Sequence, residues 1–382
     1  MAGMQSSSPR AQQLATRAAF FIPGFAVSIW APLVPFAKQQ SALDEASLGL
    51  VLLCLGAGSL LAMPLAGLWA SRMGCRRVML VTVATMCAAL PFLSAMQSAV
   101  ALGALLFVFG AGVGAMDCTM NMQAVAVERD SGTVMMSGFH AFYSIGGFAG
   151  ALLMTVLLSS GMTPALASMS GVLAIVSMTA IAAPHWRTER AAHEGPLLAW
   201  PRGSVLFIGL LAFVVFLAEG TILDWSAVFL TQVRNVDASK AGAGYVIFAL
   251  TMTAMRLCGD ALVRRLGRTR AIALGGVCAC VGFSVAVLTP WWELSLLGYA
   301  LLGLGCANIA PALFSMAGQQ RAMPEGMAIT AMTTLGYAGV LAGPALVGLA
   351  AHGWGLTAAL MVVAAAMLAV AASTTWLKQD IG

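Results

Sequence analysis

The chain has 382 residues, of which 60% are hydrophobic and 9% are charged, and its formal net charge at pH 7 is +5. No soluble core needs so much apolar surface, so the composition excludes a soluble enzyme and indicates a chain whose main solvent is lipid. The basic excess follows the pattern of a membrane topology, so it is not a footprint for nucleic acid.

Long stretches without charge divide the chain into membrane spans. Asp117 is the only charge between Val78 and Val127, and residues 131–184 and 326–377 carry none. Each stretch is long enough for two spans of ~20 apolar residues. Hydropathy and turn signals predict an all-α protein with twelve spans, near 14–37, 46–71, 78–97, 100–127, 133–160, 164–184, 204–231, 241–263, 270–290, 294–320, 326–350 and 355–377.

The positions of Lys and Arg predict the orientation of these spans, because basic residues near helix ends stay on the cytoplasmic side. With both termini in the cytoplasm, only Lys38, Arg234 and Lys240 lie outside, and Arg256 lies within a helix. The other fifteen lie inside: Arg10, Arg17, Arg72, Arg76, Arg77, Arg129, Arg187, Arg190, Arg202, Arg264, Arg265, Arg268, Arg270, Arg321 and Lys378. We expect the first apolar run to be a membrane helix rather than a cleaved signal peptide.

No sequence signal indicates a metal, a cofactor or nucleotide hydrolysis. Seven of the eight cysteines lie in apolar spans, where free Cys behaves as a small hydrophobe, and no Cys/His spacing is typical of a zinc site. The chain has no GxxxxGK[ST] phosphate-binding loop. We therefore expect no cofactor, no metal and no enzymatic activity, and an energy supply from ion gradients.

Three motifs recur at nearly one offset. Their members are Gly112, Gly114 and Asp117 with Gly303, Gly305 and Asn308 (191 residues), Trp30 with Trp225 (195), and Gly74, Arg76 and Arg77 with Gly267, Arg268 and Arg270 (193 between the glycines). The repeat predicts two pseudo-symmetric six-helix bundles, 1–184 and 204–382, joined by a cytoplasmic linker at 185–203. Such a duplication places the ligand path between the halves, near the middle of the bilayer.

The loop after the second span, Gly67-Leu-Trp-Ala-Ser-Arg-Met-Gly-Cys-Arg-Arg77, and its weaker counterpart at 260–268 resemble the major facilitator superfamily of secondary transporters. Two positions that are usually acidic there hold Ser71 and Arg264. The motifs Ala218-Glu219-Gly220 with Asp224-Trp225, and Met116-Asp117 through Asn121 to Glu128-Arg129, look like a bacterial inner-membrane branch near the fucose-permease-like sugar/proton symporters. The resemblance implies a multi-pass protein of the bacterial inner membrane.

Carboxyl groups inside spans are the leading functional candidates, since a charge at a helix centre costs ~2.5 to 3.5 kcal/mol on insertion scales. Asp117 and Glu219 are proposed proton-coupling residues. Asn121 shares a helix face with Asp117 at a spacing of four. Asp224 and Trp225 are predicted to lie near the outer mouth. For Asp117 and Asp224, the alternative is a hydrogen bond that only packs helices.

Further polar residues are candidates for the cavity or for the inner mouth. His140, with Ser137 and Ser144, forms a polar stripe, while Asn308 and Trp30 are cavity candidates through the repeat. Arg256 and Asp260, four apart, are predicted to form a structural ion pair. The other inner-gate or structural charges are Arg72, Arg76, Arg77, Arg264, Arg265 and Arg268.

These features predict a secondary transporter of a small polar solute that works by alternating access, with proton symport favoured. The sugar or sugar-like solute is implied by the resemblance alone. Two alternatives stay open: a proton-antiport exporter of drugs or metabolites, and a membrane receptor or assembly protein that does not transport. The expected partners are the solute, protons and the lipid bilayer, with no nucleic acid, and we expect a monomer.

Overall fold

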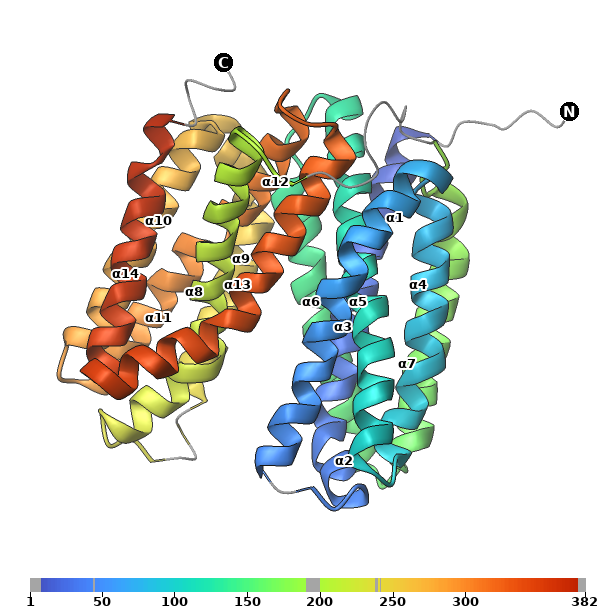
Figure 1. Cartoon of the computed structure of the whole chain (residues 1–382), viewed down its shortest axis with the longest axis horizontal. Coiled ribbons are helices and arrows are strands. Elements are labelled where there is room, and N and C mark those ends of the chain that lie inside the picture. Colours follow the sequence, from blue (N-terminus) through green and yellow to red (C-terminus); the bar gives the residue numbers. More distant parts are fainter. Residues whose placement is uncertain (1–7, 44, 190–199, 238–239, 241, 377–382) are drawn as a thin grey trace, which may run out of the picture. The chain divides into compact units, whose positions relative to one another are not determined.

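The computed structural model describes residues 8–43, 45–189, 200–237, 240 and 242–376, and in these ranges every regular element is a helix (Figure 1). Within them, twelve helical segments are long and apolar enough to cross a membrane. The predicted count and the all-α class are therefore confirmed. Arg190, Lys378 and most of the predicted linker lie outside the described residues.

Contacts within the chain define two compact units. Unit 1 comprises Met1–Thr133 and Phe142–Ala199, and unit 2 comprises Val134–Ala141 and Trp200–Gly382. The start of one helix, α6 up to Ala141, thus groups with unit 2, while the rest of that helix groups with unit 1.

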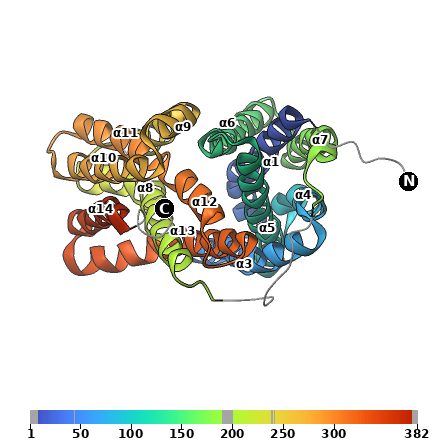
Figure 2. The same cartoon turned by 90° about the horizontal axis from the view of Figure 1, so that it is seen from above.

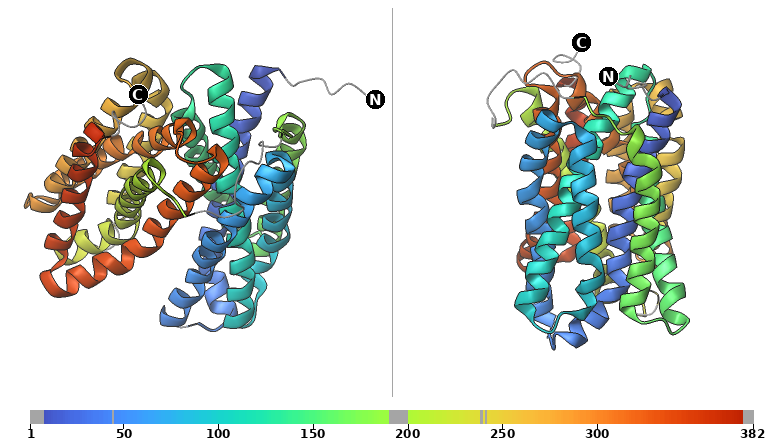
Figure 3. Two further views of the ribbon diagram at one scale, coloured as in Figure 1. Left: turned by 45° about the horizontal axis from the view of Figure 1, so that its top comes forward. Right: turned by 90° about the vertical axis from the view of Figure 1, so that its right-hand side faces the viewer.

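Unit 1 contains six membrane-spanning segments, and green α7 lies along blue α1 in the right-hand view of Figure 3. The segments are α1 (Pro9–Trp30) with η1 (Ala31–Leu33) and α2 (Val34–Gln40), α3 (Glu45–Met73), α4 (Cys75–Ala89) with η2 (Leu90–Ala95), α5 (Ala99–Ser131), α6 (Met136–Ser159), and α7 (Pro164–Ala182) with η3 (Ala183–His185).

Unit 2 contains the other six, and Figure 2 views them nearly end-on, with α14 beside α8 and α10. They are α8 (Ser204–Gln232), α9 (Ala243–Leu266), α10 (Arg268–Leu288), α11 (Trp292–Cys306) followed by α12 (Ile309–Gln319), α13 (Glu325–Trp354) and α14 (Leu356–Ala372).

Prolines interrupt three of the spans that were predicted to be continuous. The first span passes through a 3-10 turn at Ala31–Leu33, which contains Pro32. The third span passes into the 3-10 helix at Leu90–Ala95, which contains Pro91. The tenth span breaks at Ala307 and Asn308, and Pro311 lies in the first turn of the helix that resumes. A proline has no N–H to donate to the carbonyl four residues earlier, so the helical ladder is interrupted at these places.

Glycines allow the closest helix contacts inside each unit. A Cβ atom at Gly146 of α6 would lie 2.2 Å from the carbonyl oxygen of Phe21 of α1. In unit 2, a Cβ at Gly339 of α13 would lie 2.2 Å from the carbonyl oxygen of Phe213 of α8. Small residues at such points let two backbones approach closely in lipid, where no hydrophobic force draws helices together.

Glycine contacts of the same kind give the register of the internal repeat. A Cβ at Gly110 would meet the carbonyl oxygen of Leu55 at 2.0 Å, and a Cβ at Gly303 would meet that of Phe248 at 2.3 Å. Both members of the second pair lie 193 residues after those of the first. The turns at Gly74 and Gly267, with φ of +84° and +81°, differ by the same number.

This register corrects two pairings that residue identity had suggested. At an offset of 193, Asp117 corresponds to Ala310, so Asn308 is not its counterpart. In the first helix of each unit the offset is 192, from Phe21 and Phe213, so Trp30 corresponds to Ile222 rather than to Trp225. Matching similar letters along two glycine-rich helices had shifted the alignment by two or three residues.

Candidate functional site

An ion pair joins α8 and α9 in unit 2. The Oε2 atom of Glu219 lies 3.7 Å from Nη2 of Arg256, and the two side chains are 17% and 8% exposed. The other carboxylate oxygen of Glu219, Oε1, is buried and has no hydrogen-bond partner among the described residues. The proposed proton-coupling residue on α8 is thus opposed by the one basic residue predicted to lie within a span.

Arg256 also reaches the break in the tenth span. Its Nε atom donates a hydrogen bond of 3.3 Å to the carbonyl oxygen of Ala307. In a regular helix this carbonyl would accept from the N–H of residue 311, but that residue is Pro311 and has none. A side chain from α9 therefore supplies the donor that the sequence of the tenth span lacks.

Asn308, at the same break, packs against α9 one turn further along. A Cβ atom at Gly259 would lie 1.9 Å from Oδ1 of Asn308, so only glycine permits this approach. Asn308 is buried, and its Oδ1 atom has no hydrogen-bond partner among the described residues. The structure thus places the cavity candidate Asn308 against α9, next to the residue that Arg256 binds.

Asp260 faces the first turn of α6, which belongs to unit 2. The backbone N–H of Gly138 lies 3.1 and 3.2 Å from the two carboxylate oxygens of Asp260. An acidic group at a helix N-terminus satisfies free N–H groups and interacts favourably with the helix dipole. The predicted pairing of Asp260 with Arg256 stays a prediction, while Glu219 is an ion partner that the spacing rule did not indicate.

His140 lies in the same turn of α6 and is buried. Its ring centroid is 5.5 Å from that of Phe314 on α12. Ser137, three residues earlier, is also buried and lies beside Gly259. Ser137 and His140 are the part of the predicted polar stripe that lies in unit 2. They pack against α9 and α12, respectively.

The outer-mouth candidates on α8 have different surroundings. Asp224 is exposed, whereas Trp225 is half-buried and its ring lies against Gly348 of α13, 3.3 Å from a Cβ built there. The Nε1 atom of Trp225 is buried without a hydrogen-bond partner in the described part of the chain. The two neighbouring side chains, which were predicted together at the outer mouth, thus differ in exposure, and their role there stays a prediction.

In unit 1, Asp117 lies on α5 and is half-buried. Among the described residues its carboxylate has no hydrogen bond or ion pair. Asn121 is fully buried and turns back on its own helix, where Nδ2 donates to the backbone carbonyl of Asp117 at 2.9 Å. Trp30, at the end of α1, is buried as well, with 4% of its surface exposed.

The inner-gate arginines lie at the turns that follow α3 and α9. Arg264 donates through Nη1 to the carbonyl of Val134 at 3.2 Å, and Arg268 donates to Oε1 of Gln319 at the same distance. Arg72, Arg77 and Arg265 are exposed, and Arg76 is half-buried. A role for these side chains in gating remains a prediction.

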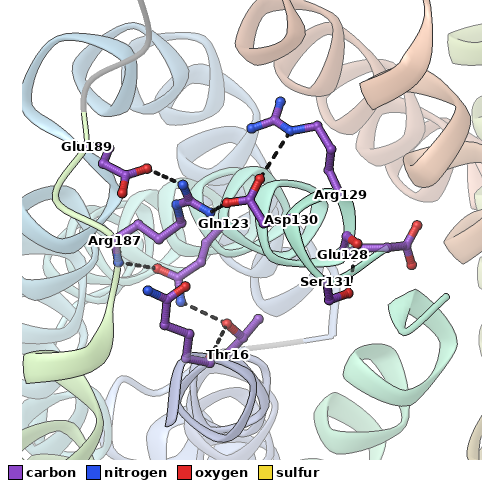
Figure 4. Close-up of polar contacts among 9 residues, drawn as sticks. Thr16, Gln123, Glu128, Arg129, Asp130, Ser131, Arg187 and Glu189 are labelled. Atoms are coloured by element: carbon purple, nitrogen blue, oxygen red, sulfur yellow. Dashed lines mark hydrogen bonds and ion pairs between the residues drawn. The ribbon is translucent and has the colours of Figure 1, made fainter. Parts of the chain in front are cut away.

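Sequence reasoning missed a polar network that holds the segment after α7, Trp186–Glu189, against the rest of unit 1. Gln123 of α5 is fully buried, donates to Oγ1 of Thr16 at 3.0 Å and accepts from the backbone N–H of Arg187 at 3.1 Å (Figure 4). The guanidinium of Arg187 also pairs with Asp130 and Glu189. In the sequence, the feature that could have indicated this network is a lone Gln within an apolar span.

Two further bonds extend this network across unit 1. The indole Nε1 of Trp186 donates to the carbonyl of Ala15 at 2.9 Å, and the backbone N–H of Arg76 donates to the carbonyl of Arg187 at the same distance. Burial lowers the pKa of Arg187, but its bonds and charge pairing with Asp130 and Glu189 outweigh this effect and raise it. The segment therefore connects α1, α5 and the turn between α3 and α4.

Comparisons with known proteins agree on one family. The model of the Major Facilitator Superfamily matches residues 18–282. An uncharacterized MFS-type transporter of Yersinia pestis is 47% identical over 363 residues, which cover 95% of this chain and 94% of that protein.

Solved structures of this fold are similar at lower identity. A variant of the fucose:proton symporter FucP of E. coli has a TM-score of 0.77 at 14% identity, over 98% of this chain and all of that one. The human organic anion transporter MFSD10 (TETRAN) has a TM-score of 0.76 at 18% identity, over 96% and all of the respective chains. At these identities the likeness establishes the fold alone. With the family model and the close relative, it follows that this chain belongs to the Major Facilitator Superfamily of transporters.

Proposed function

We propose that the protein is a proton-coupled symporter that moves a small polar solute across the bacterial inner membrane by alternating access. The observation that carries the proposal is a pair of carboxylates inside membrane spans. Asp117 has no partner for its carboxylate among the described residues, and Glu219 has one buried oxygen without a hydrogen bond. Intramembrane acids of this kind are typical of proton relays.

Proton binding supplies both the coupling and the energy in this proposal. A carboxyl that is neutral in one access state and charged in the other couples proton movement to the change of state. One charge that crosses 100 mV gains ~2.3 kcal/mol, which supports roughly fifty-fold accumulation of a neutral solute.

A sugar or sugar-like metabolite is the favoured solute. The support is the sequence resemblance to fucose-permease-like symporters, together with the shared fold of FucP, which is named as a fucose:proton symporter. Trp30 and Trp225 offer indole rings of the kind that stack on sugar faces, and Asn308 offers a buried amide oxygen. The protein is proposed to act as a monomer.

The test begins with purified protein and a thermal-shift screen of neutral sugars, sugar acids, amino acids, nucleosides and cationic drugs. A ligand that binds only the folded state raises its apparent stability. The stabilising solute is then assayed in proteoliposomes, both for counterflow and for accumulation driven by an imposed pH gradient. We expect Asp117→Asn and Glu219→Gln to retain counterflow and to lose gradient-driven accumulation.

The matched control is Glu293→Gln, because Glu293 is exposed in the first turn of α11, outside the proposed site. It should leave both activities unchanged. Full accumulation by both site variants would refute the assignment of the proton sites. Solute movement opposite to the proton would support the antiport alternative, and specific binding without counterflow would support a protein that does not transport.

We also propose that both termini lie in the cytoplasm, from the distribution of Lys and Arg. A C-terminal fusion to a fluorescent protein that matures only in the cytoplasm should fluoresce. A C-terminal fusion to an enzyme that is active only in the periplasm should be inactive, and the reverse pattern would contradict the proposal.

A further inference from the structure

The break in the tenth span and the Glu219–Arg256 ion pair form one connected unit. Arg256 lies on a buried face of α9 with Phe248, Met252, Gly259 and Val263, at spacings of three and four residues. From this face its guanidinium reaches Glu219 of α8 on one side and the carbonyl of Ala307 on the other. A single side chain thus connects three of the spans of unit 2.

Pro311 explains why an arginine is needed at this place. Without proline, the carbonyl of Ala307 would accept a hydrogen bond from the helix itself. With proline, the carbonyl must find a donor elsewhere, because an unsatisfied backbone group at membrane depth is costly. The Nε of Arg256 is such a donor, and Asn308 is the next residue along the chain.

We propose that Arg256 is a positioning residue with two connections. It holds the α11–α12 break in the geometry that places Asn308 against Gly259 of α9, and it connects this break to the carboxylate of Glu219. The inference deepens the proposed function and rests on it. When Glu219 is charged, it attracts the guanidinium that also holds Ala307. When Glu219 takes up a proton this attraction is lost, so proton binding on α8 changes how firmly the break in the tenth span is held.

Several titratable groups surround this connection and belong to its electrostatic balance. Asp224 lies on α8 itself, Tyr245 on α9 lies within electrostatic range of both members of the ion pair, and so does Cys306 at the end of α11. His140, near the start of α6, lies within electrostatic range of Arg256. Asp260 lies one turn from Arg256 on α9 and accepts from Gly138.

On α13, which packs along α8, the titratable side chains are Glu325, Tyr337 and His352. Among the carboxylates around this connection, Glu219 is the one placed 3.7 Å from Arg256 in an ion pair. The proposal therefore assigns the switch to Glu219.

The test is a rescue experiment with the full-length protein. Arg256→Gln removes both connections, whereas Pro311→Ala returns the helical N–H to the carbonyl of Ala307. In the solute counterflow assay we expect Arg256→Gln to lose about tenfold or more in rate, the effect of one unsatisfied buried group. Arg256→Gln/Pro311→Ala should regain most of that loss, yet should still fail to accumulate solute under a pH gradient, because Glu219 remains disconnected.

Arg256→Lys serves if the Gln variant does not fold. An ammonium reaches Glu219 as a point charge but has no Nε–H directed at Ala307, so Pro311→Ala should rescue this variant too. Thermal stability gives a second readout: Pro311→Ala should raise the melting temperature in the Gln or Lys background by more than in the wild type.

Equal effects of Pro311→Ala in all backgrounds, on both counterflow and stability, would overturn the inference. Gradient-driven accumulation by Arg256→Gln/Pro311→Ala would overturn the connection to Glu219. Failure of the proposed function looks different, because the wild-type protein itself would then show no proton-driven accumulation.

Discussion

Removal of either charge from the Glu219–Arg256 pair should destabilise unit 2, and removal of both should cost less than the sum. At 3.7 Å the pair attracts by about 4.5 kcal/mol with an effective dielectric constant of about 20. Both side chains are mostly buried, so water screens little of this attraction. We therefore expect Glu219→Gln and Arg256→Gln each to lower the free energy of unfolding by ~3 to 5 kcal/mol, the usual cost of an uncompensated buried charge.

The double variant contains no uncompensated charge. Its loss should fall short of the summed single losses by ~3 kcal/mol, which is the coupling that a double-mutant cycle measures. The part of the Arg256 effect that comes from the bond to Ala307 is common to both sides of the cycle, so it does not enter this coupling. Unfolding of the four proteins by sodium dodecyl sulfate in mixed micelles, followed by circular dichroism, gives the free energies.

Additive losses within ~0.5 kcal/mol would refute the reasoning, because sites that do not interact add to about this accuracy. The control cycle combines Glu293→Gln with Arg256→Gln. Glu293 is exposed at the start of α11, so this pair should be additive.

Three further substitutions test the packing of the two units. Gly339→Ala should lower the free energy of unfolding by ~1 to 3 kcal/mol or more, because its Cβ would lie 2.2 Å from a carbonyl oxygen of α8. Gln123→Leu should cost ~1 to 3 kcal/mol, because the N–H of Arg187 would lose its buried acceptor. Gly74→Ala should cost more than the ~1 to 2 kcal/mol of a left-handed backbone, because its Cβ would also lie 2.6 Å from a carbonyl oxygen of the segment after α7. Unfolding in mixed micelles measures all three.

Each of these substitutions has a matched control within the chain. Gly353 lies on the same helix as Gly339 but has no atom of the described residues within 4 Å of a Cβ, so Gly353→Ala should be neutral or stabilising by up to ~1 kcal/mol. Gln39 is exposed, so Gln39→Leu should have little effect. Gly267→Ala meets the strain at φ +81° but no clash with the described residues. Equal effects within any pair would contradict the corresponding packing argument.

Charge-free stretches predicted the twelve spans because the cost of a charge in lipid acts on sequence composition directly. The break at Ala307–Asn308 was missed, since a hydropathy window averages over Pro311. The ion partner of Arg256 was also missed. The spacing rule considers one helix, whereas Glu219 comes from another helix, and only the packing of α8 on α9 brings the two side chains together.

The corrected repeat register shows that the two units are alike in backbone and different in chemistry. Glu219 corresponds to Val27 of α1, and Arg256 corresponds to Met63 of α3, which is fully buried. Asp117 corresponds to Ala310 of α12. The duplication thus preserved the close glycine contacts that set helix packing, while each proposed proton site has an apolar counterpart in the other unit.

This asymmetry has a consequence for how the proposed sites work. In unit 2, Glu219 is opposed by Arg256, so loss or gain of a proton changes an existing ion pair. In unit 1, Asp117 has no described partner, so the same event changes the cost of an isolated charge in a membrane span. A proton on Asp117 therefore removes the cost of an isolated charge in the membrane, whereas a proton on Glu219 releases Arg256 from its ion pair. If both act in transport, Asp117→Asn should resemble the permanently protonated state and be tolerated by the fold, while Glu219→Gln should destabilise unit 2 by ~3 to 5 kcal/mol.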